Sequence, residues 1–482
     1  MMRYRHFFFN ILFLVGIGII FFMPSFAFAQ DTLGLQPIED TIALGSTDIR
    51  IIIAKIIRVV LGLLGTIVLG LMVYAGAIWM TSAGNEDKIT QAKIAAGIFD
   101  KKVYSGPWEV QIDLTNMCNN DCIGCWCHSP LLGNLAMAPH VKKKTIPFEI
   151  AKKIVDDLAK MGTRYIYFTG GGEPFMHPNT TEMIEYVKKK GLICDMSTNF
   201  TLMNKKRIER IVKAGMDHIN ISLWAGSKES YDATHPNKTG KDFTRLVEML
   251  KHLHYLKKKY KKKKPMIHIY NVISTKNYWD FENMLKTAYE AKVNGIDFTP
   301  TDVIPGKTDN LMLNRKQADE LIQKIKKSNE LMKKFELKYN HKIEFRSKEQ
   351  FIRRLSNLGI DHGEYDSNII GSMPCYAGFS FLRILADGNV NSCLKAVRIP
   401  IGNIYKDSIK TIWNNKKQNE FRKHTINYDP KNPFFENIGN EHQKGNGCYL
   451  CCDNLGMNMA IHGSIKKMNF IKKTAVKFSK HL

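Results

Sequence analysis

Cysteine, proline and acidic side chains are sparse in this chain of 482 residues, and glycine is not enriched. Ten cysteines are too few for a disulfide scaffold of this length, and 34 glycines with 16 prolines exclude a collagen-like chain. The 45 acidic residues face 70 Lys and Arg, which gives a net charge of +25. This excess favours an anionic neighbour such as nucleic acid, phosphate or lipid headgroups, or simply lysine-rich solvated faces. A hydrophobic content of 44% excludes a disordered chain, and the length suffices for more than one domain.

Charge is absent from two stretches near the amino terminus. Residues 1–29 have a basic start, an apolar run over Phe7–Phe22 and a small-x-small ending at Ala29, the layout of a signal peptide or first membrane segment. A second stretch, Val59–Met80, has 22 residues without a charge, and as a helix it would be about 33 Å long, enough to cross a bilayer. A buried soluble helix is the alternative. We expect a membrane tether, with everything after about Ala83 in the cytoplasm.

Residues 30–97, which surround this second stretch, resemble the TrbC-like pilin subunits of type IV secretion systems. The segment that carries the resemblance is IIRVVLGLLGTIVLGLMVYAGAIWMTSAGNEDKITQAKIAAG. Such subunits have a second membrane helix after the charged loop, whereas here Ile98 leads into polar sequence. The truncated pattern predicts a fusion, or a chimeric reading frame joined at Gly97 and Ile98. If the first 97 residues are an artefact, the protein is expected to be wholly cytoplasmic.

From Trp108 onward, short runs rich in β-branched and aromatic residues alternate with amphipathic helical patterns. Six strand–helix units in series predict an α/β fold, a partial (β/α)6 TIM-type barrel over residues 98–330. In such a barrel, the loops at the carboxyl ends of the strands form the active site. The expected strands are Glu109–Leu114, Tyr165–Thr169, Ile193–Ser197, His218–Leu223, Met266–Ile273 and Ile296–Pro300, and the expected helices include Phe148–Met161, Asn179–Lys190 and Lys205–Ala214.

Three cysteines follow the first expected strand at C-x3-C-x2-C spacing: Cys118, Cys122 and Cys125. Such a tight group on one loop is a metal signature. Three thiolates can hold three irons of a [4Fe-4S] cluster, which leaves the fourth iron open to another ligand. Zinc, with Cys127 or His128 as a fourth ligand, is the alternative.

Polar residues end the next three strands in an order that resembles the radical S-adenosylmethionine (radical SAM) superfamily. The second strand ends in Thr169-Gly-Gly-Gly-Glu-Pro174, the third in Ser197-Thr-Asn199 and the fourth in Ser222-Leu-Trp224. The resemblance implies that the cysteine triplet holds a cluster that binds SAM at its open iron. It also implies that the GGEP backbone pairs with the methionine amino group, with Glu173 in support, and that the other strand ends hold the ribose and carboxylate. The implied SAM-binding residues are Gly171, Gly172, Glu173, Pro174, Ser197, Asn199 and Ser222.

The triplet departs from the family pattern at one position. The family usually has an aromatic residue just before the third cysteine, and this chain has Gly124. Trp126, on the other side of Cys125, is a candidate to pack against the adenine in its place.

A second group of cysteines lies near the carboxyl end. Cys375 is followed after twelve residues by Gly388, and after four more by Cys393, while Cys448 and Cys451 form a C-x2-C pair. This pattern resembles the SPASM/twitch auxiliary-cluster domains. In its twitch form it implies one auxiliary [4Fe-4S] cluster on these four cysteines over residues 372–456.

Two alternatives stay open at this second group. Cys452 can displace Cys451 as a ligand, and zinc can replace the cluster. The segment Phe381–Asn389 contains Asp387-Gly388-Asn389 and predicts a β-hairpin. A helical linker over 331–371 is expected before the domain and a basic tail over 457–482 after it. Of the remaining thiols, Cys194 is expected in the core, and Cys127 is not expected to be a metal ligand.

The resemblance implies a function. The cluster would cleave SAM reductively, and the resulting radical would abstract hydrogen from the substrate. An auxiliary cluster points to oxidative modification of a peptide or a small molecule. A low-potential electron donor such as flavodoxin or ferredoxin is then required, which suits the reducing cytoplasm.

Two other functional classes remain. Seven lysines within Lys257–Lys264 favour RNA modification, because clustered lysines contact phosphates without reading sequence. However, this run joins a helix to the fifth strand, on the barrel face away from the expected active site, so nucleic acid is not favoured and a solvated or membrane-apposed surface is expected. The third class is a non-enzymatic, pilin-like membrane component with zinc sites.

Overall fold

The computed structural model describes residues 53–66, 69–70, 86–429, 431–439, 448, 452–468, 473 and 476. The chain divides into two compact units, Met1–Thr81 and Ser82–Leu482.

In the first unit, residues 53–66 and 69–70 are helical and their side chains are exposed. No helix within the described part of the chain is long and apolar enough to span a bilayer. The signal-like segment 1–29 and residues 71–80 of the expected membrane span lie outside the described residues. The membrane tether therefore stays a prediction.

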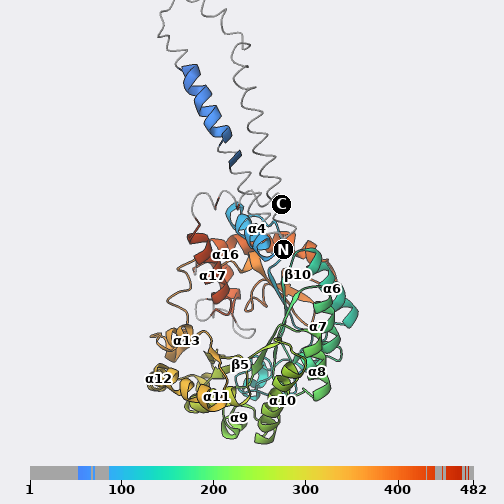
Figure 1. The fold of residues 1–482 in the computed structure, drawn as a ribbon, viewed down its shortest axis with the longest axis vertical. Coiled ribbons are helices and arrows are strands. Elements are labelled where there is room, and N and C mark those ends of the chain that lie inside the picture. Colours follow the sequence, from blue (N-terminus) through green and yellow to red (C-terminus); the bar gives the residue numbers. More distant parts are fainter. Residues whose placement is uncertain are drawn as a thin grey trace, which may run out of the picture. The chain divides into compact units, whose positions relative to one another are not determined.

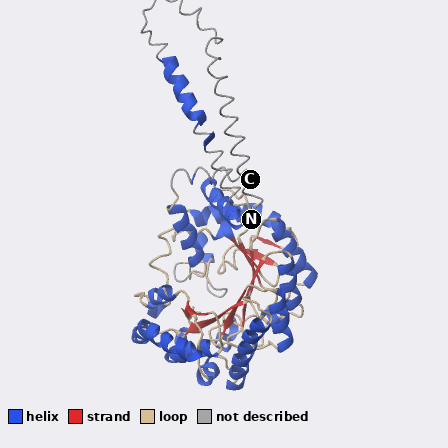
Figure 2. Ribbon diagram, viewed as in Figure 1, coloured by secondary structure: helices blue, strands red, loops and turns tan. Residues whose placement is uncertain are grey.

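The second unit is built around one curved sheet with helices on its outer side (Figures 1 and 2). Neighbouring strands from β1 to β7 pair in parallel and in chain order. The six expected strands are confirmed to within two residues at each end, and β7 adds a seventh. The strands are β1 Glu109–Ile112, β2 Tyr165–Phe168, β3 Ile193–Thr198, β4 His218–Ser222, β5 Met266–Ile273, β6 Gly295–Pro300 and β7 Glu344–Phe345.

The outer helices form because their apolar residues recur at helical spacing and cover the sheet. In α8, for example, Ile208, Ile211 and Val212 are buried, Asn204 caps the first turn and Gly215 ends the helix in the left-handed conformation. The longer helices are α6 Phe148–Lys160, α7 Thr180–Lys189, α8 Lys205–Ala214, α9 Lys228–Thr234, α10 Gly240–Lys259, α11 Phe281–Glu290, α12 Arg315–Tyr339 and α13 Lys348–Leu355. The short ones are η1 Pro130–Leu135, α5 Pro139–Lys142, η2 Pro174–Met176, η3 Tyr278–Asp280, η4 Asp309–Leu311 and η5 Ile360–His362.

The C-terminal region continues the same sheet. Strand β8 (Phe381–Ile384) pairs in parallel with β1, and β9 (Asn389–Asn391) pairs antiparallel with β8, so the expected hairpin is confirmed. Gly388 in its turn has a φ of 88°, which favours glycine. The region is thus joined to the barrel through main-chain hydrogen bonds. Its other elements are α14 Ala377–Ser380, β10 Gly402–Asn403, α15 Ile409–Asn414, α16 Lys416–Ile426, η6 Pro433–Asn437 and α17 Leu455–Lys466.

Helix α4 (Glu86–Asp100) runs through the expected junction at Gly97 and Ile98 without interruption. Ala95 and Ala96 are buried, and the helix lies against α14. The last part of the pilin-like segment therefore packs as part of the second unit.

Candidate functional site

The Cys118–Cys125 loop follows the carboxyl end of β1 and is tied down from several sides. The Ile123 N–H donates to the Thr234 carbonyl of α9 at 3.1 Å. The Asp121 N–H donates to Asn237 Oδ1 at 3.0 Å, and Asn237 Nδ2 donates back to the Asn119 carbonyl at 3.1 Å. The loop is therefore fixed by the segment after β4, and its thiols are held in defined positions.

The three thiols of this loop lie close enough to affect one another. Burial raises the pKa of Cys118 to about 12, with Glu173 and Cys125 adding to the rise. Burial and the two neighbouring thiols raise the pKa of Cys122 well above its usual range. The Cys127 side chain and the N–H groups of Cys127 and His128 instead lower the pKa of Cys125 to about 6. A cationic group bound between the three thiolates would lower the free-energy cost of burying their charges, and it would reduce their mutual repulsion.

The glycines after β2 are required by neighbouring side chains and backbone of the protein itself. A Cβ at Gly170 would lie 1.9 Å from Asp113 Cγ, one at Gly171 would lie 2.2 Å from Asn116 Oδ1, and one at Gly172 would lie 2.1 Å from the Met117 carbonyl. Glycine at these positions therefore lets the turn pack against the start of the cysteine loop.

His128 bonds the same turn to the cysteine loop. Its Nε2 donates to the Gly171 carbonyl at 2.8 Å. The glycine turn and the cysteine triplet, which the sequence placed on successive strand ends, are thus brought together.

Glu173 is buried and joins the ends of β2 and β3. Its Oε1 accepts from Thr198 Oγ1 at 2.6 Å and from the Phe175 N–H at 3.1 Å, while Oε2 accepts from the Asn199 N–H at 2.7 Å. Burial raises its pKa, and these hydrogen bonds oppose the rise. Pro174, the last residue of the turn, is buried at the start of η2. Glu173 thus connects two strand ends through direct contacts.

The other implied SAM-binding residues lie on β3 and β4. Asn199 Nδ2 donates to Asn119 Oδ1 at 2.9 Å, which ties the end of β3 to the cysteine loop. Ser197 Oγ lies 2.5 Å from Tyr167 Oη, and Ser222 is half-buried at the end of β4. Contact of these side chains with SAM stays a prediction.

Gly124, the departure from the family pattern, lies beneath an aromatic side chain from another strand end. A Cβ at Gly124 would be 3.6 Å from the Trp224 ring and 3.3 Å from Thr301 Cγ2. Trp224 follows β4, and its buried Nε1–H has no hydrogen-bond partner among the described residues. Trp224 therefore brings an indole to the position that an aromatic residue at 124 would approach.

Trp126 points toward the C-terminal region. Its Nε1 donates to the Asp302 carbonyl at 2.8 Å, and Lys395 Nζ lies 5.0 Å from the centre of its ring. Lys395 also pairs with the Asp302 carboxylate, and its N–H donates to Cys393 Sγ at 3.4 Å. A short polar chain therefore connects the two cysteine groups.

The second cysteine group surrounds one cavity. Cys375, Cys393, Cys448 and Cys452 line it together with Tyr428 and Asn458. Asn458 Nδ2 donates to Cys375 Sγ at 3.5 Å, and Cys448 Sγ donates to Tyr428 Oη at 3.2 Å. Burial raises the pKa of Cys393 to about 12 and that of Cys448 to about 11, with other cysteines of the group contributing. Cys451, the expected fourth ligand, lies outside the described residues, whereas Cys452 lies in the cavity wall.

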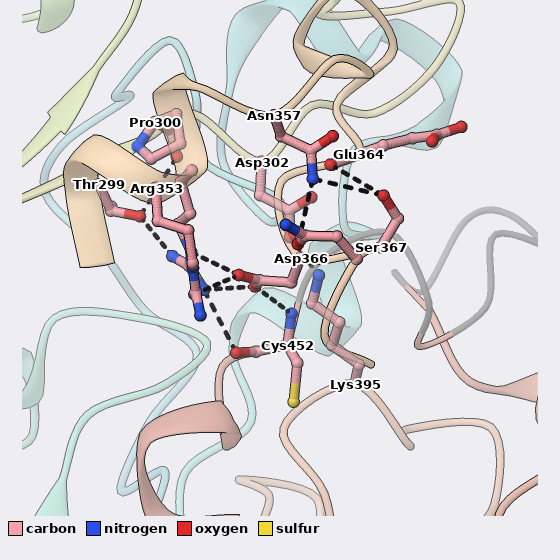
Figure 3. A network of polar contacts seen from close by, with 12 residues as sticks. Thr299, Pro300, Asp302, Arg353, Asn357, Glu364, Asp366, Ser367, Lys395 and Cys452 are labelled. Carbon is pink, nitrogen blue, oxygen red and sulfur yellow. Dashed lines mark hydrogen bonds and ion pairs between the residues drawn. The ribbon is translucent and has the colours of Figure 1, made fainter. Parts of the chain in front are cut away.

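Cys452 is held through its backbone by a buried ion pair (Figure 3). Its N–H donates to Asp366 Oδ2 at 3.0 Å, and its carbonyl accepts from Arg354 Nη2 at 3.3 Å. Arg354 and Asp366 bond to each other at 2.7 Å, and Arg354 Nη1 reaches Thr299 of β6 at 2.8 Å. The network fixes Cys452 relative to the barrel.

Sequence reasoning did not identify Lys395, Arg354, Asp366 or Trp224. The first three acquire their places only through contacts between distant segments. A signal for Trp224 was present, because it is the aromatic residue next to a polar strand end in a chain that lacks the aromatic at 124. Cys194 is confirmed as a core residue.

Two family models match the chain. The Radical SAM superfamily matches residues 112–288, and an iron–sulfur cluster-binding domain, SPASM, matches residues 375–433. The chain therefore contains a radical SAM domain followed by a SPASM/twitch cluster-binding domain. Neither match reaches the pilin-like segment.

Individual relatives match over shorter lengths. Fe-coproporphyrin III synthase of Methanosarcina barkeri is 30% identical over 25% of this chain and 28% of its own length. The subtilosin biosynthesis protein AlbA of Bacillus subtilis is 24% identical over 64% of this chain and 60% of its own length. The chain thus covers less than two thirds of these relatives.

The fold is also that of a solved structure. SuiB of Streptococcus suis, in a crystal structure with S-adenosylmethionine bound, aligns with a TM-score of 0.50 at 14% identity over 72% of this chain and 74% of that chain. This likeness supports the fold.

The cysteines fit the groups that the two domains imply, which are a SAM-binding [4Fe-4S] cluster, SAM and an auxiliary iron–sulfur centre. One site offers three buried thiols that leave an iron open, and the other offers four around one cavity. Among the described residues, no three His, Cys, Asp or Glu side chains converge as closely as a single metal ion requires.

Proposed function

We propose that this protein cleaves SAM reductively at the Cys118–Cys125 loop and removes hydrogen from a peptide, as the first step of an oxidative modification. One arrangement carries the proposal: three half-buried cysteines on a fixed loop, bonded to the GGGEP turn through His128 and to the end of β3 through Asn119. When bound, the cluster supplies the electron and SAM supplies the hydrogen-abstracting radical.

The surrounding residues orient the cofactor site. Asn119 and Asn237 hold the cysteine loop, and Glu173 holds the ends of β2 and β3 in register.

The inner face of the sheet is partly exposed at β5. Tyr270 of this strand is 36% exposed although its neighbours Ile269 and Asn271 are buried. In register it lies between Ser222 of β4 and Asp297 of β6. A substrate on the inner face would therefore approach Tyr270 and the end of β4 together.

Two relatives favour a peptide over a small molecule. AlbA, whose printed role is biosynthesis of the bacteriocin subtilosin, matches the longest part of this chain among the relatives named above. PqqA peptide cyclase of Gluconobacter oxydans is 25% identical over 25% of this chain. A small-molecule substrate is the second candidate, because AdoMet-dependent heme synthase of Nitratidesulfovibrio vulgaris is 32% identical over 26% of this chain.

RNA is less favoured as the substrate. The Lys257–Lys264 run ends α10 and precedes β5, at the amino ends of the strands. The cysteine loop follows the carboxyl end of β1, and the strands are parallel. The lysines and the loop therefore lie at opposite ends of the barrel.

The electron donor and the cellular location belong to the same proposal. A low-potential donor such as flavodoxin or ferredoxin would reduce the cluster in the cytoplasm, where thiols stay reduced. Attachment to the membrane through the N-terminal segment is proposed from the sequence alone.

Anaerobic reconstitution tests the proposal. Iron and sulfide are counted, and 5′-deoxyadenosine is measured after addition of dithionite and SAM. We expect about eight irons per chain, four at each site, and nucleoside release. Zinc without iron, or no nucleoside from the iron-loaded protein, would refute it. A modified small peptide that co-purifies with the protein would support the substrate class.

A further inference from the structure

A hollow of about 430 Å³ lies at the amino ends of β5 and β6, far along the barrel from the cysteine loop. The end of α10, the segment that leads into β5, and the residues just before β6 and β7 form its walls. We call it the lysine hollow. Its lining residues are His254, Lys257, Lys258, Lys261, Lys262, Lys263, Met266, Asn294 and His341.

The lysine hollow is lined by cations and by no carboxylate. Lys258, Lys261, Lys262 and Lys263 are exposed. The nearby Asp217 already pairs with Lys188 and Lys264. The positive charge of the lining lysines is therefore not balanced within the lining.

Lys257 is the most informative member, because it is buried with only 8% of its surface exposed. Its Nζ donates to the Pro265 carbonyl at 2.6 Å and to Asn294 Oδ1 at 3.3 Å, both neutral acceptors. Burial lowers the pKa of Lys257 to about 8. A buried ammonium group without a counter-ion is unfavourable, and a bound anion would provide the counter-ion.

One histidine in the wall, His254, responds to the same field. Burial lowers the pKa of His254 to about 4, and Lys258, His341, Lys257 and Lys292 lower it further. Every charged neighbour that shifts the pKa of His254 is basic. These neighbours give a positive potential in the lysine hollow.

We propose that the lysine hollow binds a compact anion with two or more linked phosphates, such as an inorganic or nucleoside polyphosphate. Its volume lies within the range of about 300–1,000 Å³ typical of small-ligand sites. Lysine ammonium groups bind phosphate as point charges. Single-stranded nucleic acid typically stacks its bases on aromatic side chains, and none lines the hollow apart from the two histidine rings. A concave wall also suits a small ligand better than a flat membrane.

Inorganic tripolyphosphate is the probe, and calorimetric titration of the reconstituted full chain at fixed salt is the measurement. Replacing two exposed lysines together, Lys261→Ala and Lys262→Ala, is expected to weaken binding by at least about tenfold, since each charge-assisted contact is worth about 1.5 kcal/mol or more. The matched control is Lys333→Ala with Lys334→Ala on the exposed side of α12, which removes the same charge away from the hollow. It should change the affinity by less than about twofold.

Several outcomes would overturn the proposal: no binding of tripolyphosphate, or equal weakening in the control variant, which would indicate unspecific attraction. Competition distinguishes other partners. If tRNA binds more tightly and saturating tripolyphosphate does not displace it, the surface binds a macromolecule. If phosphatidylglycerol vesicles behave in this way, the surface binds a membrane. Lys257→Met is a second variant. It should abolish binding. Because it removes a buried charge but also the donor to the Pro265 carbonyl and Asn294 Oδ1, the melting temperature of the ligand-free variant is measured to show that it is folded.

Discussion

The two cysteine groups are built in opposite ways. The first group, Cys118, Cys122 and Cys125, comes from one loop of eight residues, and the rest of the barrel holds that loop in place. The second group draws Cys375, Cys393, and the neighbouring pair Cys448 and Cys452 from three separate places in the chain around one cavity. The first site is thus local in sequence and supported from outside, whereas the second exists only when the C-terminal region has folded.

The difference matters for chemistry. A three-thiol loop leaves one iron open for a substrate of the cluster, whereas four thiols complete the coordination of the other. The polar chain of Trp126, Asp302 and Lys395 connects the two sites. We therefore expect that either site can lose its iron while the other keeps it, and that turnover of the substrate requires both sites.

The largest effect is expected from the combined change Cys118→Ala, Cys122→Ala and Cys125→Ala. Without thiolates, the open-iron cluster cannot assemble, so iron should fall from about eight to about four per chain and 5′-deoxyadenosine should disappear. Iron analysis and nucleoside assay measure both. Cys194→Ala, in the core of β3, is the control and should retain iron and activity. Full nucleoside output from the triple variant would contradict the assignment.

Cys452→Ser tests the second site alone. Because Cys452 lies in the cavity wall, the variant should lose about four irons and substrate turnover while it keeps SAM cleavage at the first site. Cys451→Ser is the matched comparison and should keep about eight irons. If Cys451→Ser loses the iron and Cys452→Ser does not, the ligand assignment reverses.

Asp366→Asn tests whether the ion-pair network of Figure 3 supports the second site. Asp366 is fully buried and pairs with Arg353 and Arg354, so loss of its charge should lower the free energy of unfolding by about 3–5 kcal/mol. Thermal unfolding of the anaerobic protein measures this. Asp319→Asn, which removes an exposed partner of Arg315, should cost less than about 1 kcal/mol. Equal effects would show that the buried network has no special role.

The smallest effect is expected at the first site, from Trp224→Ala. If the indole over Gly124 packs against the adenine, SAM affinity should fall about tenfold, since a base stacked on an aromatic ring gains about 1–3 kcal/mol. Gly124→Phe in the Trp224→Ala background should restore part of the affinity, because it returns an aromatic ring to the family position. Equilibrium binding of SAM measures both variants. No change in either would place the adenine elsewhere.

The strands and the first site could be predicted from sequence because their signals are local. Alternating β-branched residues define β1 to β6, and the cysteine spacing lies within one loop. At Gly170, Gly171 and Gly172 the structure adds a reason for glycine that the sequence did not show. Asp113, Asn116 and Met117 occupy the space that a side chain at these positions would need.

The second site could be predicted only in part. The spacing of Cys375, Gly388 and Cys393 indicated the domain, and β8 and β9 form the expected hairpin. The position of Cys452 in the cavity wall depends on Arg354 and Asp366, which hold its backbone from more than 80 residues earlier in the chain. The spacing of the cysteines cannot predict such a contact, because it arises when segments distant in the sequence pack together.

The parallel pairing of β8 with β1 means that the C-terminal region also serves as an edge cover. In a chain shortened before Phe381, the main-chain N–H and C=O groups of β1 that now bond to β8 would face solvent. An uncovered strand of this kind is a template for association with other chains. The barrel would therefore tend to precipitate when it is expressed without the C-terminal region. Expression and redesign of the protein would have to keep the two regions together.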